Sequence, residues 1–136
     1  MNELDTIVDV GWVEEERLPG LLASADAGLY LMDDTLLNWT KCPVKLADML
    51  YAGVPTVGEA IGQVSEFIIS GKTGFLRPPG DIAGLTEDLL CLLQDPILRK
   101  KLSKGARRHI QNNFSWNKLA DLAEQLYLDN PSKEAH

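Results

Sequence analysis

The first half of the chain alternates between short apolar runs and segments with helical spacing. Residues 6–13 and 27–32 are rich in β-branched and aliphatic side chains, which is typical of strands. The second run is nearly continuous in apolar residues, as in a parallel strand covered on both faces. Between the two runs, apolar residues of 18–25 recur at spacings of three and four, which predicts a short helix.

The stretch TKCPVKLADMLYAGVP at 40–55 predicts a second helix. Pro43 suits its first turn, and Gly53 suits the position just past its end, where the backbone turns left-handed. Apolar residues that include Val44 occur around most of this helix, so we expect most of its circumference to be buried. Lys45 and Asp48, three positions apart, occupy the one remaining stripe.

The rest of the chain completes one α/β domain that spans residues 1–136. The apolar run 54–60 predicts a third strand, 62–70 a helix, and 75–77 a final short strand. The sequence therefore predicts a Rossmann-like parallel sheet of about four short strands with flanking helices within 6–77. A C-terminal helical segment follows at 81–129, with helix start signals at Asp81, Asp95 and Ser115.

Charge and cysteine usage restrict the function. The net charge of −7 argues against nucleic-acid binding, and no apolar run approaches the roughly 20 residues of a membrane span. With no signal-peptide pattern at the N-terminus, we expect a cytoplasmic protein and leave open peripheral attachment to the inner face of a membrane. Cys42 and Cys91 have no neighbours at ligand spacing, so we expect reduced thiols, no metal site and no cofactor.

The predicted helix after Asp95 contains six basic residues: Arg99, Lys100, Lys101, Lys104, Arg107 and Arg108. A basic run of this kind is typical of a solvated helix face. The alternative is a patch that binds an acidic partner or anionic lipid head groups.

The start of the predicted helix at Pro43 is the candidate for chemistry. Unpaired N–H groups and the helix dipole favour an anion there, and a polar loop at 33–41 follows a strand, where open α/β sheets bind ligands. Lys45 and Asp48 lie next to this end, although a pair at this spacing is also typical of a solvated surface. Gly62 allows close approach of the backbone to a ligand, and Glu66 follows one helical turn later. The alternative is a glycine needed only to leave the strand and a solvated glutamate.

Five segments in this order resemble the second half of the nucleotide-sugar-binding domain of group 1 retaining glycosyltransferases with the GT-B fold. They are DVGWV, LPGLLASADAGLYL, PVKLADMLYAGVPTV, GQVSEFIISGKTGFLRPPGD and a closing FSW helix. The resemblance implies that the start of helix 43–52 binds the donor diphosphate and that Asp48 holds the ribose hydroxyls. The implied donor-binding residues are Thr40, Pro43, Val44, Lys45, Asp48, Gly62 and Glu66.

The chain departs from the family pattern in two ways. Thr40 stands where the family commonly has a glutamate that contacts the donor sugar, and Asp33 and Asp34 are candidate substitutes. The Arg and Lys that neutralise the leaving diphosphate in the family follow a strand that has no counterpart here. We therefore expect a truncated domain that does not turn over alone.

The resemblance implies a glycosyltransferase fragment that binds a nucleotide diphosphate sugar and acts on a lipid-linked or polysaccharide acceptor, which a missing N-terminal domain delivers. The alternatives are a non-catalytic interaction module that retains the fold and a nucleotide-sugar epimerase-like domain. We also expect a homo-oligomer joined through open sheet edges or through the apolar stripe of the closing helix, which comprises Leu119, Leu122 and Leu126.

Overall fold

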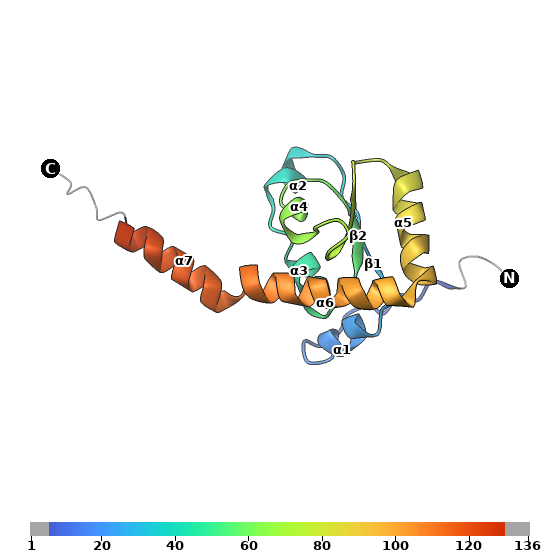
Figure 1. The fold of residues 1–136 in the computed structure, drawn as a ribbon, viewed down its shortest axis with the longest axis horizontal. Helices are drawn as coiled ribbons and strands as arrows, with labels where there is room; N and C mark the ends of the chain where they lie inside the picture. Colours follow the sequence, from blue (N-terminus) through green and yellow to red (C-terminus); the bar gives the residue numbers. More distant parts are fainter. Residues whose placement is uncertain (1–5, 130–136) are drawn as a thin grey trace.

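The computed structural model describes residues 6–129. Its centre is a parallel sheet of three strands in the order β1-β2-β3, with bounds Gly28–Tyr30, Thr56–Glu59 and Gly74–Arg77 (Figure 1). Leu29 pairs with Val57, and Val57 pairs with Phe75. This arrangement confirms the predicted α/β fold with a parallel sheet, although the described residues contain three strands and not about four.

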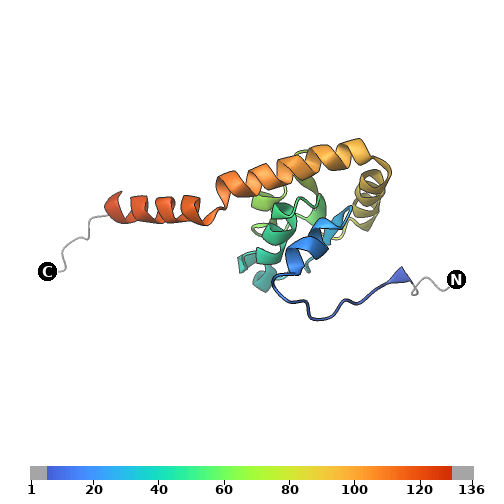
Figure 2. The same cartoon turned by 90° about the horizontal axis from the view of Figure 1, so that it is seen from below.

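The prediction of a strand at residues 6–13 is wrong. This segment runs along the outside of the body as extended chain before the first helix (Figure 2). Ile7, Val8 and Trp12 are 72%, 79% and 96% exposed. A β-branched run becomes a strand only where another strand offers backbone partners, and β1 pairs with β2 alone among the described strands. Leu29 of β1 is 47% exposed, so the expectation that this strand is covered on both faces is also wrong.

Four short helices accompany the sheet: α1 at Leu18–Ala23, α2 at Leu36–Thr40, α3 at Val44–Tyr51 and α4 at Val64–Phe67. The helix predicted after Pro43 is thus confirmed as α3, and Gly53 just beyond it has a φ of 83°. Helix α2 was not expected within the polar loop. It begins because the side chain of Thr35 accepts a hydrogen bond from the Asn38 N–H.

Three longer helices complete the chain: α5 at Ile82–Gln94, α6 at Pro96–Asn113 and α7 at Trp116–Asp129. All three predicted start signals act as N-caps. Asp81 accepts from the Gly84 N–H at 3.0 Å, and Asp95 accepts from Ile97 and Leu98 at 2.9 Å each. The hydroxyl of Ser115 accepts from the Lys118 N–H at 3.3 Å. These side chains satisfy N–H groups that have no partner within their helices.

Two groups of buried side chains hold the helices on the sheet. The first group joins α3 and α4 to α6 and includes Leu46, Leu50, Phe67 and Ile110. The second joins β2 to α5 and α6 and consists of Val57, Leu85, Leu92 and Leu102. Because α6 contributes to both groups, it ties the two parts of the core together.

Helix α7 extends from the end of α6 away from the rest of the molecule (Figure 1). None of its side chains is buried. The predicted apolar stripe is on its surface, where Leu119, Leu122 and Leu126 are 41%, 44% and 70% exposed. This helix therefore gains little from packing within the described part of the chain.

Candidate functional site

A hollow of about 800 Å³ opens beside the carboxyl ends of β1 and β2. The loop predicted to bind a ligand contributes Asp33, Asp34 and Lys41 to its lining, and Gly80 closes it from the segment after β3. Ligands of open α/β folds bind at this edge of the sheet. The hollow is thus in the position that the order of strands and helices predicted.

Glu59 connects the two backbone segments at the rim of this hollow through hydrogen bonds. Its carboxylate, at the end of β2, accepts hydrogen bonds from the Met32 N–H at 3.1 Å and from the Gly80 N–H at 2.8 Å. The residue is only 8% exposed. Sequence reasoning missed Glu59, and the available signal was a single carboxylate inside the apolar run VPTVGEA. A buried carboxylate needs such partners, since burial without them is unfavourable.

The two aspartates considered as substitutes for a sugar-binding glutamate have different surroundings. The Asp34 carboxylate accepts from the indole N–H of Trp39 at 2.6 Å, which holds it against α2. The backbone carbonyl of Asp33 accepts from the Asn38 amide at 2.8 Å. Thr40 itself is exposed, and its hydroxyl donates to the Leu37 carbonyl at 3.1 Å.

Helix α3 begins without a capping side chain, in contrast to α5 and α6. Pro43 at its start is buried, whereas Lys45 and Asp48 are exposed, as their spacing predicted. The first N–H groups of a helix have no intrahelical partner and lie at the positive end of its dipole. The Val44 N–H donates to the Cys42 carbonyl at 3.0 Å, and no side-chain carboxylate caps this end of α3.

A second, more apolar hollow of about 510 Å³ lies between α3 and the junction of α6 with α7. Val44 and Asp48 line it together with Phe114 and Trp116. Val44 is 62% exposed, so the expectation that most of the α3 circumference is buried is wrong. The other helices cover only the face of α3 that carries Leu46 and Leu50.

Gly62 and Glu66 flank the start of α4. Gly62 has a φ of 52°, and a Cβ at this position would lie 2.6 Å from the carbonyl oxygen of Trp39. Contact with α2 therefore requires a glycine here, independently of any ligand. Glu66 is exposed, and its backbone carbonyl is 2.7 Å from Nε2 of His109. Thr40, Lys45, Gly62 and Glu66 line neither of the two hollows.

Cys42 and Cys91 are free and exposed. Residues 6–129 contain no group of three His, Cys, Asp or Glu side chains placed to hold a metal ion. Within the same range no helix has the length and apolar character needed to cross a membrane.

These observations define a Rossmann-like α/β domain with an open carboxyl edge beside an uncapped helix start. Residues 2–95 match the family described as glycosyl transferases group 1, and the chain belongs to this family. Its fold is that of the GT-B glycosyltransferases, in agreement with the resemblance of the sequence.

Two relatives, both longer than this chain, show which fraction of their length it matches. Glycogen synthase of Mycobacterium tuberculosis is 29% identical over 119 residues, which are 88% of this chain and 28% of that protein. N-acetyl-alpha-D-glucosaminyl L-malate synthase of Bacillus anthracis is 28% identical over 116 residues, 85% of this chain and 29% of that protein. The chain thus spans under a third of the length of each.

Solved structures show the same fold. Sucrose-phosphate synthase of Thermosynechococcus elongatus superposes with a TM-score of 0.73 at 26% identity, over 92% of this chain and 30% of that one. Anabaena HepE in complex with UDP-glucose has a TM-score of 0.64 at 21% identity, over 80% of this chain and 29% of that one.

Proposed function

We propose that the chain supplies the donor-binding part of a glycosyltransferase and takes up a nucleotide diphosphate sugar. The observation that carries this proposal is the uncapped start of α3, followed one turn later by the exposed carboxylate of Asp48. The family supports it, since its members are glycosyl transferases. The structure of the related fold in HepE, whose complex contains UDP-glucose, is consistent with it.

In this proposal each end of the donor has its own partner. The N–H groups of the first turn of α3 donate to the diphosphate oxygens, and Lys45 adds a positive charge beside them. Asp48 lies about 6 Å further along the helix axis from Val44, and its carboxylate accepts hydrogen bonds from two ribose hydroxyls. Thr40, Gly62 and Glu66 border the donor sugar. No cofactor takes part, because the nucleotide is a substrate.

Sugar transfer needs more than this domain. In a retaining transfer the enzyme stabilises the departing diphosphate and binds an acceptor. We assign both tasks to parts of the glycosyltransferase outside this domain. The acceptor in this proposal is lipid-linked or a polysaccharide. The protein acts in the cytoplasm or at the inner face of a membrane.

Calorimetric titration with UDP, GDP and ADP tests the proposal. At least one of the three nucleotides is expected to bind with measurable heat, and the preferred base then identifies the donor class. If none of the three binds to the chain or to its full-length parent, the domain has no donor site and the proposal is overturned.

Replacing Asp48 with alanine is expected to weaken nucleotide binding by about 1.5–3 kcal/mol, because a charge-assisted hydrogen bond is lost. The free energy of unfolding is expected to change by less than about 0.5 kcal/mol, since the side chain is exposed. Calorimetry measures the first change and urea unfolding the second. Glu124→Ala in α7 is the matched control. An unchanged affinity for Asp48→Ala would identify Asp48 as a solvated surface residue.

We also propose that the chain associates with a second copy. Exposed apolar side chains at the predicted contact positions favour this: Leu29 of β1 is 47% exposed, and the stripe of α7 is exposed along its length. Multi-angle light scattering at increasing protein concentration is expected to show a dimer or a higher oligomer. Leu122→Glu with Leu126→Glu is expected to lower the mass if α7 forms the contact. A monomer at every concentration would contradict this proposal.

A further inference from the structure

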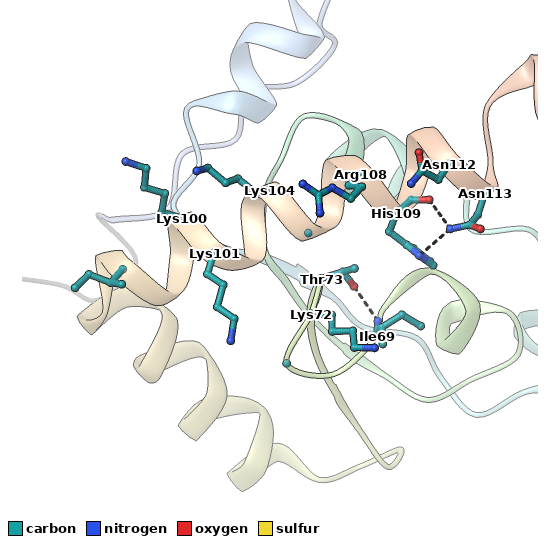
Figure 3. Close-up of a pocket in the computed structure, with 13 residues that line it drawn as sticks. Ile69, Lys72, Thr73, Lys100, Lys101, Lys104, Arg108, His109, Asn112 and Asn113 are labelled. Atoms are coloured by element: carbon teal, nitrogen blue, oxygen red, sulfur yellow. Dashed lines mark hydrogen bonds between the residues drawn. The ribbon is translucent and has the colours of Figure 1, made fainter.

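A third hollow, of about 970 Å³, lies along α6 (Figure 3) and shares no lining residue with the two hollows described above. It is bounded by α6 and by the turn at 69–73, which leads into the amino end of β3. The turn and the helix are in direct contact, because a Cβ on Gly105 would lie 1.9 Å from the carbonyl oxygen of Lys72. Because Gly105 has no side chain, the backbones of α6 and of the turn can come into contact.

The lining of this hollow is strongly cationic. It contains neither aspartate nor glutamate, and its five charged residues are Lys72, Lys100, Lys101, Lys104 and Arg108. None of the five makes a salt bridge within the described part of the chain, whereas Arg77 and Arg99 each have an aspartate partner. This local positive charge stands in a chain with a net charge of −7. Because no carboxylate of the described residues forms a salt bridge with these five groups, an anion that enters the hollow meets no competing acidic side chain.

Fixed groups hold the walls in place. The hydroxyl of Thr73 accepts from the Ile69 N–H at 2.8 Å and donates to the Phe67 carbonyl at 3.2 Å, which fixes the turn. At the far end, Nε2 of His109 donates to the Glu66 carbonyl at 2.7 Å, and Nδ1 accepts from the Asn113 amide at 3.1 Å. The charges therefore extend from a preformed scaffold.

The positions of the charges indicate the kind of ligand. Lys101 extends from α6 on the side of the turn, and Lys100 and Lys104 leave the helix on the other side (Figure 3). Arg108 of α6 and Lys72 of the turn complete the charged lining. We propose that this hollow binds an anionic ligand that carries phosphate, in addition to the donor site.

Calorimetry of the full chain with inorganic tripolyphosphate tests the site directly. Lys72→Ala combined with Lys101→Ala is expected to weaken binding by about tenfold or more, since two charge-assisted contacts are lost. Arg17→Ala combined with Lys118→Ala removes the same formal charge outside the hollow and is expected to leave the affinity within about twofold. Binding is also expected to weaken as the salt concentration rises.

A flotation assay distinguishes a soluble ligand from a lipid head group. Vesicles of phosphatidylglycerol with phosphatidylcholine are compared with vesicles of phosphatidylcholine alone. Binding of the wild-type chain to tripolyphosphate or to the anionic vesicles, lost in the Lys72/Lys101 variant, supports the site in either form. The proposal is overturned if neither probe binds, or if the Arg17/Lys118 control loses as much affinity. Asp48→Ala is expected to weaken UDP binding without affecting tripolyphosphate, so failure at one site does not imply failure at the other.

Discussion

Replacing Leu46 with alanine is expected to lower the free energy of unfolding by about 2–5 kcal/mol. Leu46 is fully buried and lies in the core group that joins α3 and α4 to α6. Truncation removes apolar surface from this group and leaves a cavity that the surrounding helices fill only in part. Urea denaturation followed by far-UV circular dichroism measures the change as a lower midpoint with a similar slope.

Val44→Ala is the matched control on the same helix. Because Val44 is 62% exposed, its truncation is expected to change the free energy of unfolding by less than about 0.5 kcal/mol. Equal losses for the two variants would mean that both faces of α3 contribute to the core. That result would restore the interpretation of α3 as a helix buried around most of its circumference.

Replacing Glu59 with alanine is expected to lower the free energy of unfolding by about 2–3 kcal/mol, because the N–H groups of Met32 and Gly80 lose their acceptor. This loss of stability is at the lower end of the range expected when two backbone N–H groups lose their acceptor, since Gly80 is exposed and water can reach its N–H group. Thermal unfolding and urea denaturation both report this change.

Glu59→Gln separates the hydrogen bonds from the packing of the side chain. Glutamine keeps nearly the same shape and one carbonyl oxygen, but its amide places a donor against one of the two N–H groups. An intermediate loss of stability is therefore expected. If glutamine and alanine at this position were both as stable as the wild type, Glu59 would not fasten the rim of the hollow.

Local signals made the helical half of the chain predictable. Asp81 and Asp95 act on N–H groups only two or three residues away, so the sequence contains both the donor and the acceptor of each cap. The same holds for Pro43 and Gly53 around α3, since φ preferences are properties of single residues.

Features that depend on distant partners were predicted less well. Residues 6–13 have the composition of a strand but no neighbouring strand to pair with in the described structure. The role of Glu59 depends on N–H groups at 32 and 80, which lie far from it in sequence. The cationic hollow is a similar case, because Lys72 joins the basic residues of α6 only through the contact at Gly105.

The candidate donor site was predictable to an intermediate degree. Spacing within one helix was enough to place Lys45 and Asp48 at the surface near the start of α3. It was not enough to show that Asp48 faces a hollow shared with Phe114 and Trp116, since these come from the junction of α6 with α7.

The exposed position of α7 has a consequence for the cooperativity of the domain. A helix of 14 residues without buried side chains is near the length at which isolated helices are marginally stable in water. Its amide hydrogens are therefore set to exchange with solvent through local fraying, at free energies far below that of global unfolding. A partner surface that covers Leu119, Leu122 and Leu126 would protect the amide hydrogens of α7 from exchange with solvent. Contact and ordering would occur together, so the helical content of α7 is itself a readout of assembly.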